Sequence, residues 1–87
     1  MIKFILGESR TLQFEVLHQK DEDFIIASCE YSIVAEDEII ESGQMDIDGH
    51  MMSIHFTPER VGNYILSFFY TIAGERHAGR YHITVAE

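Results

Sequence analysis

The sequence predicts an all-β protein in which two antiparallel sheets pack as a sandwich of seven or eight strands. Apolar residues alternate with other residues at period two along most of the chain, as in strands that bury one face. Turn signals recur about every eight to twelve residues, a spacing typical of two-sheet sandwiches. No window of the sequence has the apolar periodicity of a helix.

The longest clean alternation lies between Tyr64 and Ile72. Five residues share one parity and are expected on one strand face: Tyr64, Leu66, Phe68, Tyr70 and Ile72. Pro58 and Gly62 precede this strand, and both interrupt a sheet ladder. Residues 57–62 are therefore predicted to connect one sheet to the other.

The remaining strands follow from the same alternation. The other residues expected to point inward are Ile2, Phe4, Leu6, Leu12, Phe14, Val16, Ile25, Ala27, Cys29, Tyr31, Ile33, Met45, Ile47, Met52, Ile54, Phe56, Tyr81, Ile83 and Val85. Turns are expected at residues 7–10, 19–23 and 36–38, at Ser42-Gly43, at Asp48-Gly49 and at Ala73-Gly74, with a short strand at Ile39 and Ile40. No repeat or linker interrupts the series, so residues 1–87 are predicted to form one domain.

The entry to the long strand carries a resemblance. Gly62-Asn63-Tyr64 followed by Leu66 resembles the Gly-x-Tyr-x-Cys entry to strand F of immunoglobulin-like sandwiches. The resemblance implies a Greek-key topology in which the Tyr64 hydroxyl bonds back to the preceding corner. Leu66 stands in place of the cysteine and the chain has no Trp, so the similarity is to bacterial and phage modules rather than to antibody domains.

Charge and cysteine content restrict the partners and the compartment. The net charge of −9 argues against binding to nucleic acid or to an anionic membrane, because both need a basic face. Cys29 is the only cysteine, so no disulfide can form within the chain, which fits a reducing compartment. The sequence has no signal-peptide pattern and no apolar run of membrane-spanning length. A cytoplasmic or virion-associated protein is expected.

One apolar cluster is a candidate contact surface for another protein. Ile65 and Phe69 have the outward parity of the long strand, where polar residues are expected. Val34, Arg80 and His82 are expected beside them on the neighbouring strands. Apolar residues with arginine at their edge are typical of protein contacts, but isolated apolar residues on a surface are also ordinary. Both interpretations stay open.

No catalytic residue, metal ligand or cofactor is predicted. No two of the histidines (His18, His50, His55, His77 and His82) are two positions apart on one strand, the spacing that would bring two rings together. The start of a calcium loop at residues 46–49 lacks its later ligands, so a hairpin is preferred. Cys29 has core parity, and the carboxylates at residues 36–41 are expected to be solvated. Arg76 and Arg80 share parity, which indicates either docking to an acidic partner or an ordinary solvated hairpin.

The preferred hypothesis is therefore a non-catalytic structural or protein-interaction module, such as a phage-derived or accessory assembly component of a bacterium. Its partner would be another protein or a second copy of the chain, bound through a sheet face or an edge strand. The alternative is a small module that binds a ligand or a carbohydrate. An enzyme is the least favoured hypothesis, because the short loops leave little from which to build a cleft.

Overall fold

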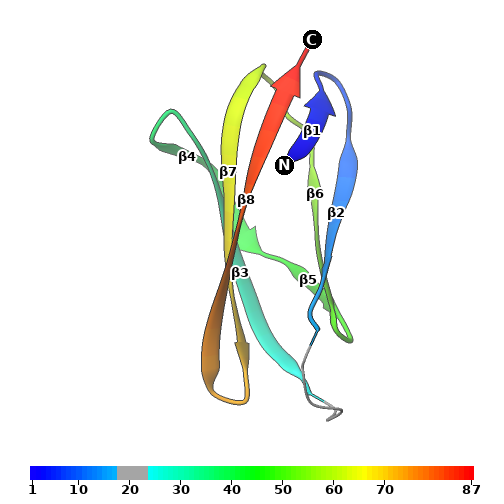
Figure 1. The fold of residues 1–87 in the computed structure, drawn as a ribbon, viewed down its shortest axis with the longest axis vertical. Helices are drawn as coiled ribbons and strands as arrows, with labels where there is room; N and C mark the ends of the chain where they lie inside the picture. Colours follow the sequence, from blue (N-terminus) through cyan, green and yellow to red (C-terminus); the bar gives the residue numbers. More distant parts are fainter. Residues whose placement is uncertain (18–23) are drawn as a thin grey trace.

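The computed structural model describes residues 1–17 and 24–87, which form two β-sheets packed face to face (Figure 1). The strands are β1 (Ile2–Ile5), β2 (Arg10–Glu15), β3 (Ile26–Ala35), β4 (Glu38–Gln44), β5 (Asp46–Asp48), β6 (Met51–Phe56), β7 (Gly62–Ile72) and β8 (Glu75–Ala86). One sheet has the order β1-β8-β7-β3-β4 and the other has the order β2-β6-β5. All pairs are antiparallel except β1 with β8. The prediction of an all-β, two-sheet architecture is confirmed. His18 and the turn predicted at residues 19–23 lie outside the described residues.

The core fills the space between the two sheets. Its buried members are Phe4, Leu12, Val16, Ile26, Cys29, Ile33, Met45, Met52, Ile54, Phe56, Tyr64, Leu66, Phe68, Ile72, Ile83 and Val85. The alternation in β6 and β7 matches the prediction, because Met52, Ile54 and Phe56 are all buried and so are most of the inward residues of β7. Residues 57–62 carry the chain from the three-stranded sheet to the five-stranded sheet, as predicted.

The expected inward face of β3 is wrong at its beginning. Ile25 and Ala27 are exposed, and Ile26 is buried instead. The pairing of β3 with β7 shifts between Ile26 and Ser28, so Ala27 is an extra residue in the ladder. Such a bulge reverses the parity of every residue before it. After the bulge the expected parity holds, with Cys29 and Ile33 buried and Tyr31 packed against the core.

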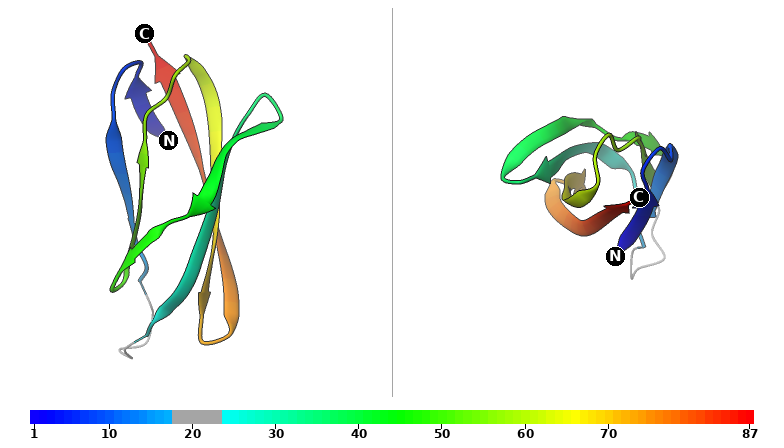
Figure 2. Two further views of the ribbon diagram at one scale, coloured as in Figure 1. Left: turned by 180° about the vertical axis from the view of Figure 1, so that it is seen from behind. Right: turned by 90° about the horizontal axis from the view of Figure 1, so that it is seen from above.

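The turn predicted at Ser42-Gly43 is also wrong, because both residues lie inside β4. Gly43 pairs with Tyr31 on β3. A Cβ placed on Gly43 would lie 3.6 Å from Cε1 of the Tyr31 ring, so the ring covers the glycine. The chain leaves this sheet instead at Met45, between β4 and β5 (Figure 2, left). The Met45 amide donates to the Cys29 carbonyl across 2.9 Å, which fixes the crossing point against the core.

Three further inward assignments fail at strand ends and sheet margins. Leu6 is 40% exposed, because β1 ends at Ile5 and the chain turns at Gly7. Ile47 is 38% exposed, because β5 is a three-residue edge strand. Tyr81 is 40% exposed, because β1 pairs only with residues 83–86 of β8 and leaves the earlier part of β8 at the margin.

Two-residue loops close three hairpins. Glu36 and Asp37 join β3 to β4, and both have positive φ, at 51° and 63°. Ala73 and Gly74 join β7 to β8 with φ of 50° and 80°, as the sequence predicted. The hairpin expected at Asp48-Gly49 forms one residue later, with Gly49 and His50 in the loop. The first two loops have positive φ at both positions, which twists a hairpin in the same sense as its strands, whereas the third has it at Gly49 alone.

Candidate functional site

The outward residues of the five-stranded sheet include a continuous apolar row. Val34 on β3 pairs with Ile65 on β7, and Ile65 pairs with His82 on β8. On the other side Val34 pairs with Ile39 on β4. Ile39 is 63% exposed and Ile65 is 37% exposed, while Val34 between them is half-buried. The structure thus brings together three of the residues predicted to form the contact patch and adds Ile39.

Phe69 lies on the same face, two inter-strand rows away. It is 42% exposed and pairs with Glu30 on β3 and with Ala78 on β8. The Arg76 guanidinium lies over its ring, 4.3 Å from the centroid, in the geometry of a cation–π contact. Phe69 and Arg76 border a shallow depression with a volume of about 170 Å³. The sequence analysis expected Arg80, not Arg76, beside Phe69. The parity that Arg76 shares with Arg80 was the feature of the sequence that placed Arg76 on the same face.

Arg80 occupies the row between Ile65 and Phe69. It pairs with Ser67 on β7, which in turn pairs with Ser32 on β3. All five predicted contact residues therefore lie on one surface, called here the outer sheet face. Its residues are Val34, Ile39, Ile65, Phe69, Arg76, Arg80 and His82.

The outer sheet face is the basic side of an acidic protein. The outward positions of β1, β3, β7 and β8 include Lys3, Arg76 and Arg80 against the single carboxylate of Glu30. With neutral histidine these four strands present a charge of 3 − 1 = +2, whereas the whole chain carries −9. The rest of the sequence therefore carries −11, so this face differs in sign from the chain as a whole.

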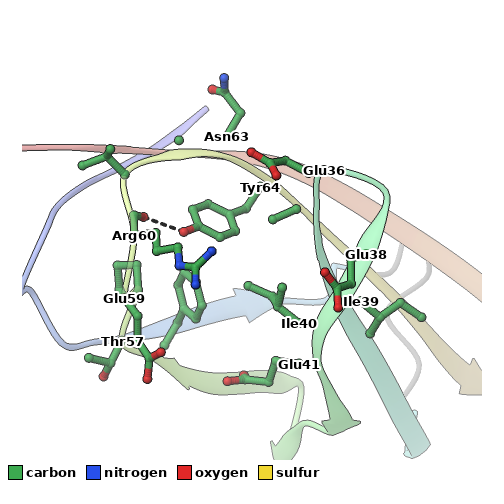
Figure 3. A pocket seen from close by; sticks show the side chains of 15 residues that line it. Glu36, Glu38, Ile39, Ile40, Glu41, Thr57, Glu59, Arg60, Asn63 and Tyr64 are labelled. Carbon is green, nitrogen blue, oxygen red and sulfur yellow. Dashed lines mark hydrogen bonds between the residues drawn. The ribbon is translucent and has the colours of Figure 1, made fainter.

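A groove opens between β4 and the connection from β6 to β7 (Figure 3). Its volume is about 510 Å³. The lining residues are Ala35, Glu36, Glu38, Ile39, Ile40, Glu41, Phe56, Thr57, Pro58, Glu59, Arg60, Val61, Gly62, Asn63 and Tyr64. Ile40 projects from β4 into the space, and Glu59 and Arg60 project from the opposite wall (Figure 3). Glu36, Glu38 and Glu41 line the groove, whereas Asp37 does not. Glu36 and Asp37 form the exposed turn between β3 and β4.

The groove exists because the chain changes sheets between β4 and β5. β5 pairs only with Met51, Met52 and Ser53 of β6, so the rest of β6 lacks a neighbour on that side within the described residues. β4, on the other wall, has β3 as its only described partner in the sheet. Two strand edges therefore flank the opening. Sequence reasoning missed this site, and the exposed pair Ile39-Ile40 between glutamates was its one signal.

The corner at Tyr64 forms one end of the groove. The Tyr64 hydroxyl donates a hydrogen bond to the Arg60 carbonyl (dashed in Figure 3), as the resemblance to strand F implied. Gly62 has a φ of +138°, which side chains other than glycine rarely adopt. The structure therefore places Gly62 and Tyr64 at this corner.

Other groups considered for chemistry are held in structural contacts. Cys29 is 1% exposed, its Sγ lies 3.3 Å from Met45 Sδ, and burial raises the pKa of its thiol to about 11. The Tyr31 hydroxyl donates to Glu41 across 2.8 Å, and burial together with this bond raises the pKa of Tyr31 to about 12. Among residues 1–17 and 24–87 no group of three or more histidine, cysteine, aspartate or glutamate side chains is placed to hold a metal ion. No helix in this part of the chain has the length and hydropathy needed to cross a membrane.

Comparisons with known proteins show the fold alone. No protein-family model and no curated protein matches the chain. One solved structure that matches is an engineered protein, with a TM-score of 0.77 and 11% identity over 99% of this chain. Another is a proposed glycoside hydrolase from Bacteroides vulgatus ATCC 8482, with a TM-score of 0.59 and 17% identity over 100% of this chain. The chain corresponds to 18% and 17% of the lengths of these two chains.

Proposed function

We propose that the chain is an immunoglobulin-like module with Greek-key topology. The order β2-β6-β5 corresponds to strands B, E and D of that fold, and β4-β3-β7-β8 corresponds to strands C′, C, F and G. The corner bond between Tyr64 and Arg60 supports the same assignment. The assignment to one domain over residues 1–87 and the bacterial or phage setting are part of this proposal.

The function that the geometry supports best is non-catalytic protein binding through the outer sheet face. The observation that carries the proposal is the continuity of its apolar row, because Ile39, Val34 and Ile65 are register neighbours on three strands. Single apolar residues on a surface are ordinary, but a contiguous exposed patch marks an interaction site. Phe69, with Arg76 over its ring, lies on the same face beyond the row of Ser32, Ser67 and Arg80, and both residue types are enriched at interfaces.

The charge of the face favours an acidic partner over a second copy. A symmetric dimer would place the same patch on both sides of the interface, so Arg76 and Arg80 of each copy would face a surface of like charge. An acidic partner would instead complement these side chains. The proposed partner is therefore a protein whose contact surface combines apolar and carboxylate side chains.

Site-specific photo-crosslinking in the cells that express the gene tests this function. A photo-reactive amino acid at position 69 is expected to give a covalent adduct with a partner protein. The same group at position 47, where Ile47 is 38% exposed on β5, is the matched control and is expected to give none. Light scattering over a concentration series then shows whether the purified chain self-associates and whether Phe69→Asp abolishes that association. No adduct at position 69, or an adduct only with a second copy of the chain, would overturn the proposal.

A second candidate, carbohydrate binding, is favoured by one observation. Tyr81 is 40% exposed at the sheet margin, where its ring stacks on that of Phe68 and is tilted by 36° to that of Phe14, with centroids 5.9 and 4.8 Å away. An exposed aromatic ring held in this way can contact the apolar face of a sugar. A bound sugar would raise the melting temperature, because it binds the folded state only. A panel of soluble glycans that leaves the melting temperature of the wild type unchanged would exclude this function.

A further inference from the structure

We propose that the groove beside β4 binds an extended segment of another protein that combines apolar and basic residues, and that this segment adds to the sheet as a strand along β4. The groove shares Ile39 with the outer sheet face and none of the other residues of that face. The inference therefore goes beyond the proposed function and can hold or fail independently of it.

The backbone of β4 supplies the first argument. β4 is an edge strand whose described sheet partner is β3 alone, so its other side presents unpaired amide and carbonyl groups. An extended peptide can satisfy such groups by adding one more strand. Across the opening, residues 54–56 of β6 also lack a neighbouring strand on the side of β5 within the described residues. The opening is thus bordered by strand edges on both sides.

The side chains supply the second argument. Ile40 is 48% exposed and projects into the groove, whose other apolar lining includes Pro58 and Val61. Ile39 is 63% exposed and pairs with the outward-facing Val34. Ile40 is the extra residue of a bulge in β4, since Ile33 pairs with Glu41 and Val34 pairs with Ile39. An added strand that lies across this bulge would contact both isoleucines. Apolar residues in the added strand would therefore remove exposed surface of β4 from water.

Charge complementarity sets the chemistry of the partner segment. Four carboxylates line the groove (Glu36, Glu38, Glu41 and Glu59) against one guanidinium, Arg60. Lysine or arginine in the bound segment would pair with this excess of negative charge. Glu41 is half-buried and accepts the Tyr31 hydroxyl, so its carboxylate is held in a fixed place on the wall of the groove.

The same charges exclude a second copy of the chain as the occupant. Two β4 edges in contact would bring Glu38 and Glu41 of one copy against those of the other, and like charges across a ladder destabilise pairing. Glutamates on an edge strand are a known protection against self-association. In this protein the glutamates would repel a second copy of the chain but not a basic strand. Repulsion of the wrong partner would therefore give the edge its specificity.

Selection from a random twelve-residue peptide library on the purified wild-type chain tests the proposal. Enriched peptides are expected to alternate apolar residues with lysine or arginine. Their affinity is expected to fall at least tenfold for Ile40→Lys and for Glu38→Lys, since both residues line the groove and both are exposed enough to be replaced without loss of the fold. Ile47→Lys, at an exposed isoleucine on β5, is the matched control and is expected to bind as the wild type does. Melting temperatures establish that all variants are folded.

Hydrogen exchange identifies the mode of binding. An added strand is expected to slow exchange of the β4 amides that face away from β3, and addition of salt is expected to weaken the complex. The proposal is overturned if the selection enriches no peptide, if the enriched peptides are acidic or bind Ile40→Lys as tightly as wild type, or if the β4 amides remain unprotected in the complex. Unchanged binding by Phe69→Asp separates this result from that of the outer sheet face.

Discussion

At Gly79, the addition of a single carbon atom as a side chain is expected to disturb the core. It lies opposite Phe68 in the pairing of β7 with β8. A Cβ on Gly79 would lie 2.7 Å from Cε2 of the Phe68 ring and closer still to Cζ. The ring is 3% exposed and packs against Phe14, with centroids 5.0 Å apart, so it has little room to move. An aromatic side chain that covers a strand glycine in this way compensates for the missing side chain.

We expect Gly79→Ala to destabilise the protein by about 1–3 kcal/mol, the usual cost of overpacking a core. Gly43→Ala is the matched control, because it is also inside a strand and its new Cβ would lie at an ordinary 3.6 Å from the Tyr31 ring. That variant is expected to be neutral or more stable by up to about 1 kcal/mol. Urea unfolding of both variants measures the difference, and equal midpoints would show that Phe68 yields to the added atom.

Cys29 gives a prediction about pH. Because the pKa of its thiol is raised to about 11 from 9.0, the folded state holds the proton more tightly than the unfolded state does. This contribution to stability is complete below pH 9 and is lost as the pH rises toward 11. The free energy of unfolding is therefore expected to decline across that interval. In the folded protein at pH 8, iodoacetamide is expected to alkylate the thiol at least about tenfold more slowly than in urea, because the raised pKa lowers the thiolate fraction and burial restricts access of the reagent. Equal rates in the two solvents would show that the thiol is accessible and unperturbed.

At the scale of elements, the β7–β8 hairpin contains one residue with an unfavourable backbone conformation. Ala73 occupies the first loop position with a φ of 50°, which is unfavourable for alanine and well tolerated by asparagine. We expect Ala73→Asn to stabilise the protein by about 0.5–1 kcal/mol. Gly74→Ala, at the next position with a φ of 80° and open space around it, is expected to destabilise by about 1–2 kcal/mol through backbone strain alone. Thermal unfolding of the two variants should move in opposite directions, and a shared direction would contradict the turn geometry.

Strand parity could be predicted where the ladder is regular and not where it slips. The residues of β6 and β7 alternate without interruption, so period two alone identified their buried faces. Ala27 carries no sign of being an extra residue, because a bulge depends on the register with β7 and not on the local sequence. Ser42-Gly43 was predicted to be a turn because glycine is common in turns. Gly43 lies inside a strand instead, where the Tyr31 ring of the neighbouring strand covers it, and the sequence alone does not show this contact.

The two candidate sites also differ in how far they could be predicted from the sequence. The outer sheet face could be predicted in part, because adjacent strands were assigned correctly and parity placed Ile65 and Phe69 outward. Parity placed Arg76 on the same face as Arg80, but it does not give the course of the side chain, so the contact of Arg76 with the Phe69 ring was missed. The groove could not be predicted from the sequence. It arises because the chain leaves the five-stranded sheet at Met45, and β5 then pairs with only residues 51–53 of β6.

At the scale of the whole molecule, the excess of negative charge is expected to limit stability at low salt. The chain has 15 carboxylates and 6 lysine or arginine residues, and its shape measures 43 × 22 × 18 Å. The Debye length is about 30 Å at 0.01 M salt and about 8 Å at 0.15 M. At the lower concentration charges on opposite sides of the sandwich still repel one another, and unfolding relieves this repulsion by separating them.

The melting temperature is therefore expected to rise when sodium chloride is increased from 0.01 to 0.15 M. Relief of about 0.5–1 kcal/mol corresponds to a shift of roughly 2–8 °C for a domain of this size. Choline chloride is the control, because it screens charge as sodium chloride does but cannot bind between carboxylates in the way that a sodium ion can. Equal shifts with both salts would assign the effect to screening, and a shift with sodium alone would indicate bound cations instead. A melting temperature that falls with both salts would mean that the attraction between the basic outer sheet face and the acidic remainder outweighs the repulsion.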